Sequence, residues 1–384
     1  MAAEDVFERA RGLVNLYDEE LRRLVPAGAE IFDAHVHVGR DIDGMVGAAD
    51  ELLATFERYG ISRGFAFCMD EPGRRPAFRA ANDRTLAAAE RSGGRLIPFV
   101  RLDLSENPIE EARRCLDLGA RGIKLHPRAQ RFLLNDERLA PVFELAAERR
   151  VPILIHGGRG LPPIADELRR LVEANPEAQL IIAHGGIVDL AALSEAFAGR
   201  PGVFFDTSVW SPIDLLDVLC RFSPEQGLYA SDYPYGQQPS SLVLSLRVAR
   251  AAGFDEEQVR DLLGRTAARI EAGNPPVQPT APRPRLTLEQ PMAFARIHSY
   301  ITMATPLLWT RQQDSIGVLG LALNACRERD GHVETRERIS ELLAAARDLW
   351  RSAAEVEEDE RFAIGRTTFR LLHLADVEAV TAGV

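Results

Sequence analysis

The sequence predicts an α/β protein, a (β/α)8 TIM barrel with a leading helix and an additional C-terminal helical region. Eight short apolar runs between residues 30 and 231 are each followed by a longer amphipathic stretch. Such alternation is typical of a parallel sheet with right-handed crossovers. Eight units in about 240 residues also match the usual size of this barrel. An open doubly wound sheet is the alternative, but no Gly-rich phosphate loop follows the first strand at His37.

The expected elements follow one another along the chain. A leading helix is expected over 3–25, where apolar residues recur at helical spacing. The expected strands are 30–38, 63–69, 96–102, 121–126, 151–156, 179–184, 202–207 and 227–231. The expected helices of the barrel include 77–91, 109–118, 136–148, 163–174, 190–198, 213–221 and 240–252.

A change of composition divides the chain into three expected regions. Residues 1–273 form the barrel, 274–285 a linker and 286–384 a helical C-terminal region. Five prolines within Gly273–Pro284 predict the linker. Beyond it, the expected helices are 293–305, 315–329, 335–354 and 361–381, and the acidic run 355–360 is interpreted as a solvated turn or helix start.

Composition limits the class of partner. Hydrophobic residues make up 46% of the chain, and the net charge of -11 argues against a broad nucleic-acid-binding surface. No run of about 18 apolar residues predicts a membrane span. Four scattered cysteines and the absence of an apolar signal core favour a reduced, cytoplasmic setting. We therefore expect a small-molecule substrate, with neither nucleic acid nor membrane as a partner.

Residues able to bind a metal or a substrate recur where the predicted strands end. A lone histidine at such a place is more often a hydrogen-bonded core residue than a ligand. Here, however, every histidine before residue 273 lies at a predicted strand end, and in a barrel these ends meet at one face. Side chains two residues apart on a strand point to the same face of the sheet. The set comprises His35, His37, Lys124, His126, His156, His184 and Asp232.

Five motifs around these residues carry a resemblance to a known family. They are FDAHVHVG (32–39), GIKLHP (122–127), ILIHGG (153–158), IIAHGG (181–186) and LYASDYP (228–234). With them the sequence resembles the amidohydrolase superfamily, in particular the amidohydrolase-related group with 2-amino-3-carboxymuconate-semialdehyde decarboxylase-like enzymes. The resemblance covers about residues 30–271 and has no counterpart for 286–384.

The resemblance implies a divalent metal held by His35, His37, His156 and Asp232. Three nitrogens and one carboxylate suit Zn²⁺, with Mn²⁺, Fe or Co as alternatives. Asp232 is the implied catalytic base, and His184 the second catalytic residue. A second metal bridged by a carboxylated Lys124, with His156 and His184 as ligands, is the alternative form.

Further residues at the strand ends have implied or expected roles in binding. Lys124 and His126 are implied to contact the substrate. Arg101, at the end of the strand 96–102, either binds a substrate carboxylate or pairs with Asp103. Asp206 and Ser208 are expected to hydrogen-bond the histidines.

The predicted function is that of a metal-dependent hydrolase. It would cleave an amide, lactone or ester of a small carboxylated molecule by attack of a metal-activated water. A metal-dependent non-oxidative decarboxylase of an aromatic or muconate-type acid is the alternative. A non-catalytic scaffold predicts degraded ligand positions, and every position here is intact. The region 286–384 is a candidate lid, partner-binding module or homodimer interface, and we expect truncation near residue 275 to change oligomeric state or solubility but not metal content.

Overall fold

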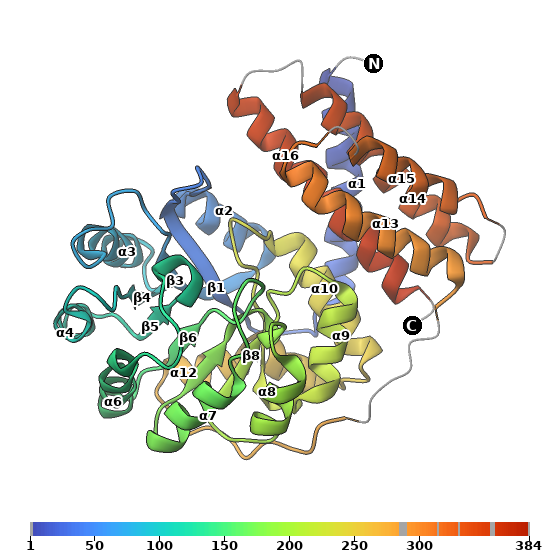
Figure 1. Cartoon of the computed structure of the whole chain (residues 1–384). Helices are drawn as coiled ribbons and strands as arrows, with labels where there is room; N and C mark the ends of the chain where they lie inside the picture. The colour runs from blue at the N-terminus through green and yellow to red at the C-terminus, as the bar shows by residue number, and fades with distance from the viewer. Residues whose placement is uncertain (1–2, 284–289, 313–314, 329–330, 354–357, 383–384) are drawn as a thin grey trace.

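A computed structural model describes residues 3–283, 290–312, 315–328, 331–353 and 358–382 (Figure 1). The end of the predicted linker, at 284–285, and the start of the acidic run, at 355–357, lie outside these residues. In the described part of the chain, no helix combines the length and the apolar character that crossing a bilayer requires.

Among the described residues, nine strands form one sheet in the order β2-β1-β3-β4-β5-β6-β7-β8-β9. All neighbours pair in parallel except β2, which is antiparallel to β1. The sheet curls, and backbone hydrogen bonds join its two ends: Ala34 N–H donates to Tyr229 O at 2.8 Å, and Asp232 N–H to His35 O at 2.9 Å. This arrangement is consistent with a TIM barrel. The strands are β1 Ile31–Arg40, β2 Val46–Gly47, β3 Ile61–Cys68, β4 Leu96–Arg101, β5 Gly122–Leu125, β6 Ile153–Ile155, β7 Leu180–Ile182, β8 Val203–Asp206 and β9 Gly227–Leu228.

Helices follow the strands as the sequence predicts, within a few residues at their ends. Helix α2 was not predicted: only Leu52 and Phe56 of its residues are fully buried, so its apolar pattern is sparse. The short helices α5 and α11 were not predicted either. The helices of this part of the chain are α1 Ala3–Leu24, α2 Ala49–Tyr59, α3 Arg79–Arg91, α4 Pro108–Asp117, α5 Pro127–Gln130, α6 Ala140–Arg149, α7 Ala165–Ala174, α8 Leu190–Phe197, α9 Pro212–Arg221, α10 Gln238–Ala251, α11 Glu256–Arg260 and α12 Thr266–Glu271, with short turns η1 Glu137–Leu139, η2 Ala183–Gly186, η3 Pro224–Gln226 and the π-helical η4 Asp261–Arg265.

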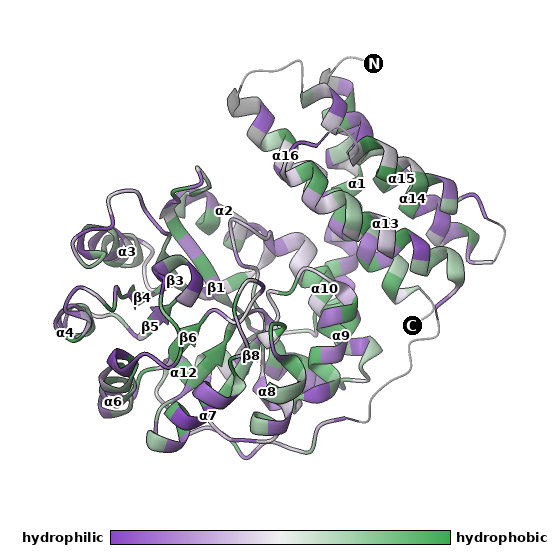
Figure 2. Ribbon diagram, viewed as in Figure 1, coloured by the Kyte–Doolittle hydropathy of each residue, from purple (hydrophilic) through white to green (hydrophobic). Residues whose placement is uncertain are grey.

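The interior of the curled sheet is filled by side chains. Phe32, Phe65 and Phe99 pack there with ring centroids 4.6–4.7 Å apart, beside aliphatic residues of the later strands. A second apolar layer lies between the sheet and its surrounding helices. Hydrophobic colouring on the strands and hydrophilic patches on the outer helices reflect these layers (Figure 2). Since the interior is packed, any functional site must lie at an end of the strands.

The C-terminal region forms a helical bundle beside the sheet (Figure 1). Its helices are α13 Met292–Trp309, α14 Ser315–Ala325, α15 Val333–Ser352 and α16 Glu358–Thr381. The leading helix α1 packs against α15 and α16, and the hydroxyl of Tyr17 donates to Glu378 of α16 at 2.8 Å. The extra C-terminal helices expected from the sequence are therefore present, and α1 lies among them in space.

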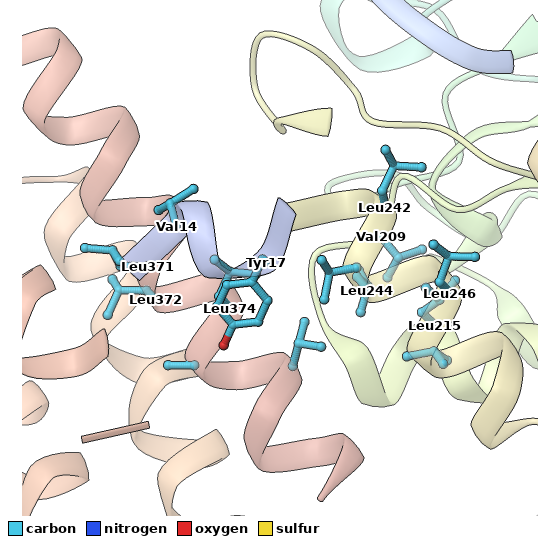
Figure 3. Close-up of a cluster of buried hydrophobic side chains, with 14 of the residues drawn as sticks. Val14, Tyr17, Val209, Leu215, Leu242, Leu244, Leu246, Leu371, Leu372 and Leu374 are labelled. Carbon is cyan, nitrogen blue, oxygen red and sulfur yellow. The ribbon is translucent and has the colours of Figure 1, made fainter. Parts of the chain in front are cut away.

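One hydrophobic core runs from the bundle into the helices around the sheet. Arg247 of α10 extends the contact, because its guanidinium donates to Glu20 of α1 at 2.8 Å and to Glu378 of α16 at 3.0 Å. The bundle is thus anchored by both apolar burial and partly buried ion pairs. Figure 3 shows this cluster, with Val14 and Tyr17 of α1, Leu371, Leu372 and Leu374 of α16, Leu242, Leu244 and Leu246 of α10, and Val209 and Leu215.

Truncating a side chain in this shared core should destabilise the whole chain. Leu372 is 0% exposed, so Leu372→Ala is expected to lower the free energy of unfolding by about 2–5 kcal/mol. Urea denaturation followed by circular dichroism measures the effect. Leu321→Ala, at a side chain 45% exposed on α14, is the matched control and should change the value by less than about 0.5 kcal/mol. Equal losses in the two variants would contradict a core that runs through α16.

Candidate metal centre and active site

An irregularity in β1 turns two histidines into the mouth of the sheet. Phe32 and Ala34 face the packed interior, so strict alternation would turn His35 outward. The pairing of β1 with β3 shifts register between Asp33 and Val36. At this shift β1 has one residue more than β3, which forms a bulge. The bulge turns His35 to the inner side of the sheet, and His37, two residues later, faces the same way. Such bulges often re-aim a side chain beside an active site.

Asp232 meets these two histidines from the other end of the sheet. It follows β9 and has a left-handed backbone, with φ of 59°. Its Oδ1 lies 3.2 Å from Nε2 of His35 and 3.2 Å from Nε2 of His37, and the two Nε2 atoms are 3.2 Å apart. Within the described residues, these three form the one group of ligand-type side chains whose donor atoms lie within 4.8 Å of one another.

The geometry of this triad fits a divalent metal. In a tetrahedral zinc site with bonds of 2.0–2.1 Å, neighbouring ligand atoms are about 3.3 Å apart. The three distances of 3.2 Å approach that edge length. The Nδ1 of His35 lies 2.8 Å from Asp206 Oδ2, so its proton is held there and its Nε2 lone pair faces the triad.

Both histidines are held in the neutral form that metal binding requires. Burial lowers the pKa of His35 well below its usual value, and nearby Lys124 and His184 lower it further. Burial also lowers the pKa of His37 to about 3, against the opposing effect of Asp232. Neutral imidazoles keep a lone pair for a metal at any pH near 7.

His156 and His184 form a second pair next to the triad. His184 Nε2 lies 2.9 Å from His156 Nδ1, and the rings of His184 and His35 are 5.2 Å apart. His156, predicted as a fourth ligand, is not in the triad's group, although its buried Nε2 finds no hydrogen-bond partner among the residues described. Such an open nitrogen fits a ligand to a metal or a substrate.

The backbone around this pair is tightly constrained. The sequence predicts a strand through residue 184, but β7 ends at Ile182 because His184 has a left-handed backbone, with φ of 57°. Asp206 Oδ1 accepts the His184 N–H at 2.8 Å, and Ser208 holds His184 Nδ1 at 2.9 Å. A Cβ on Gly158 would lie 2.9 Å from both imidazoles, so only glycine fits there. The predicted hydrogen bonding by Asp206 and Ser208 is thus present.

Lys124 lies inside the site, fully buried. Its Nζ is 3.3 Å from Nε2 of His35 and 4.4 Å from the centre of the Phe67 ring. Burial lowers the pKa of Lys124 to about 7, although the charges of Asp232 and Asp206 act in the opposite direction. The amine is therefore partly neutral near pH 7, unlike a solvated lysine.

The sequence suggested that His126 and Lys124 share a strand face, but in the structure they do not. The strand ends at Leu125 because Pro127 starts the short helix α5, and His126 caps that helix by accepting the Ala129 N–H at 3.3 Å. Its ring stacks on His156 with centroids 3.9 Å apart. His126 therefore supports His156 directly, and contact with a substrate stays a prediction.

Arg101 is buried beside Lys124, with which it is paired in the register of β4 and β5. Its Nη1 donates to the Cys68 carbonyl at 3.2 Å, and its guanidinium lies 5.0 Å from the Phe78 ring centre. In the described chain its Nε and Nη2 have no hydrogen-bond partner. Asp103, the other partner considered, instead accepts from Ser105. Two open donors on a buried cation suit a planar anion.

Two residues near the triad were not singled out from the sequence. Asp33 is buried and accepts from His35 N–H, Ser231 N–H and Gln238 Nε2, which ties β1 to the segment before Asp232. Burial raises the pKa of Asp33 to about 7, although these hydrogen bonds lower it. Tyr235 sets its ring edge-on against His37, with centroids 5.6 Å apart. Their places in the sequence, two residues before His35 and three after Asp232, were the available signal.

Comparison with known proteins identifies the family. The family model described as amidohydrolase matches residues 32–270, which include all five motifs. The chain therefore belongs to the amidohydrolase family, as the motifs implied. A search of curated proteins with this sequence finds no match.

Solved structures also match a large part of the chain. A protein named as an amidohydrolase from Staphylococcus aureus is 17% identical with a TM-score of 0.50, and the match covers 64% of this chain and 99% of that one. One named as a 2-pyrone-4,6-dicarboxylic acid hydrolase from Pseudomonas putida is 21% identical, with a TM-score of 0.49 and coverage of 64% and 98%. The 2,6-dihydroxybenzoate decarboxylase from Rhizobium is 17% identical, with a TM-score of 0.48 and coverage of 64% and 98%. At these identities the likeness concerns the fold alone.

Asp206 should control metal affinity without touching the metal. Asp206→Asn weakens the acceptor for the His35 Nδ1 proton, so we expect the dissociation constant for Zn²⁺ to rise about 10–100-fold. Competition with a chromophoric chelator measures it. Asp117→Asn, at a side chain 62% exposed, is the matched control and should leave the constant unchanged. An unchanged affinity in Asp206→Asn would show that this hydrogen bond does not prepare His35 for a metal.

Proposed function

We propose that this chain is a divalent-metal-dependent hydrolase with a (β/α)8 barrel. Its substrate would be an amide, lactone or ester of a small carboxylated molecule, and its metal Zn²⁺, with Mn²⁺ as the alternative. The observation that carries the proposal is the triad of donor atoms 3.2 Å apart, in which Asp206 orients His35. Membership of the amidohydrolase family supports it. The cytoplasmic location and a homodimer through 286–384 stay predictions.

The residues of the site divide the chemistry between them. When bound, a divalent metal acts as a Lewis acid and makes water a nucleophile at neutral pH. The carboxylate of Asp232, partly exposed at the mouth, accepts the proton of the attacking water and passes it to the leaving atom. His184, fixed by Ser208, polarises the substrate and assists that transfer.

Arg101 supports a carboxylated substrate. A buried guanidinium with two open N–H donors is costly unless an anion completes it. A substrate carboxylate would bind these donors side by side. The same donors also favour the alternative, decarboxylation of an aromatic or muconate-type acid, because they bind a carboxylate whether or not it is removed.

Lys124 decides between one metal and two. Its burial and lowered pKa provide the neutral amine that reaction with CO₂ requires. A carboxylated Lys124 bridging a second metal is therefore the alternative form. As a plain amine, Lys124 would instead contact the substrate.

Metal analysis and a substrate panel test the proposal together. We expect purified chain to hold metal at a stoichiometry near one or two, and His37→Ala or Asp232→Asn to lose both metal and activity. A fall from two metals per chain to one or none in Lys124→Ala would support the bridged form. A single metal in the unmutated chain that survives Lys124→Ala would support the mononuclear form. Ring opening of carboxylated lactones without CO₂ release would support hydrolysis. If the unmutated chain takes up no metal even after reconstitution, the proposal fails.

Removing the Arg101 charge should affect substrate binding more than chemistry. For the carboxylated substrate found in the panel, Arg101→Gln is expected to raise KM at least about tenfold with a smaller change in kcat, since one charged hydrogen-bonding contact contributes about 1.5–3 kcal/mol. Steady-state kinetics with that substrate and its methyl ester measure the effect, and the ester should show little difference. Arg121→Gln, at an exposed arginine, is the control. Equal losses with acid and ester would contradict a carboxylate-binding role.

A further inference from the structure

We propose that helix α16 of the C-terminal bundle positions the metal centre, by fixing the two loops that carry Ser208 and Asp232. The inference rests on the proposed metal-dependent function for its affinity readout. It assigns a role in the site to residues outside the part of the chain that matches the family, which ends at residue 270. The residues concerned are Arg366, Arg370 and His373.

These three residues form one face of α16. They are separated by four and three positions, which places them on one side of a helix. Leu371, Leu372 and Leu374 are buried in the cluster shared with α1 and α10 (Figure 3). The helix packs against both α9 and α10, whose first residues follow the two loops. α16 is therefore anchored in the core while its polar face meets the loops.

The first loop, after β8, is held by His373. The ring of His373 stacks on Trp210 with centroids 4.3 Å apart and planes 15° apart. Two residues before Trp210, Ser208 contacts His184 Nδ1 at 2.9 Å and donates to Asp206 at 2.5 Å. A shift of Trp210 would thus move the groups that orient His184 and, through Asp206, His35.

The second loop, after β9, is held by Arg370 and Arg366. Arg370 Nε donates to Gln237 Oε1 at 2.6 Å, and Gln237 Nε2 donates to the Arg366 carbonyl at 3.0 Å. The guanidinium of Arg366 lies 5.8 Å from the ring centre of Tyr233. Tyr233 directly follows Asp232, and its carbonyl accepts the His37 N–H at 2.7 Å. Two residues of this loop, Tyr233 and Gln237, are therefore in contact with α16.

The backbone of Asp232 explains why the loop must be held. A left-handed non-glycine residue costs on the order of 1–3 kcal/mol and persists only where its surroundings determine it. The Gly236 N–H donates to the Asp232 carbonyl at 2.9 Å. The next residue, Gln237, accepts the hydrogen bond from Arg370 of α16. On this inference, losing the C-terminal region would weaken metal binding, whereas the expectation from sequence is that metal content stays unchanged.

The test compares full-length variants by two measurements. The loop variants are Arg370→Gln, His373→Ala and His373→Phe, the last of which keeps a ring against Trp210. In the metal-free chain, hydrogen exchange by mass spectrometry should be faster in peptides covering 207–211 for both His373 variants and 232–238 for Arg370→Gln. The Zn²⁺ dissociation constant, from chelator competition, should rise at least about tenfold in Arg370→Gln and His373→Ala, and less in His373→Phe.

Two controls separate positioning from general destabilisation. Leu374→Ala removes a buried side chain from the same helix, so it should lower the unfolding midpoint and leave the Zn²⁺ affinity unchanged. Arg351→Gln, at an exposed arginine of α15, should change neither. The inference is overturned if the loop variants keep wild-type exchange and affinity, or if Leu374→Ala weakens Zn²⁺ equally. If the unmutated chain binds no Zn²⁺, the proposed function fails, and loop exchange in the metal-free chain alone decides the role of α16.

Discussion

The carboxylate of Asp206 is the group on which the geometry of the site depends. It is completely buried, so its charge must be met by hydrogen bonds. It accepts from His35 Nδ1, the His184 N–H, and the N–H and hydroxyl of Ser208. These donors come from β1, from the turn after β7 and from the loop after β8. One side chain therefore fixes the His35 tautomer and the left-handed turn at His184 together.

A curled parallel sheet makes this convergence possible, because each strand delivers its last side chain to the same face. The face is nevertheless built from short and irregular pieces. β9 has two residues, and β1 shifts register just before its histidines. In sites of this kind, irregular backbone places the functional side chains. The surrounding packing has to stabilise these irregular conformations.

Much of this arrangement could be predicted from the sequence, because alternating apolar runs identify strands and barrel topology gathers their ends. The misses have local physical causes. The left-handed backbone at His184 ends β7 before the predicted residue, and a histidine is only a weak sequence signal for that conformation. The burial of Lys124 depends on Phe67 and on neighbouring strands that are distant in sequence. Likewise, the apolar face of α1 does not reveal that its partners are α15 and α16, more than 300 residues away.

The contacts of α16 bear on how folding and metal binding are linked. A metal that binds only the native arrangement stabilises it by mass action. If α16 holds the ligand loops, the coupling is reciprocal. The free energy by which the docked bundle strengthens metal binding then equals the free energy by which the bound metal stabilises the docking of the bundle. A tenfold difference in affinity corresponds to about 1.4 kcal/mol. That amount is small against the burial of the leucines that anchor α16, so the helix can stay docked in the metal-free chain while its polar face still sets how well Asp232 and His184 are placed.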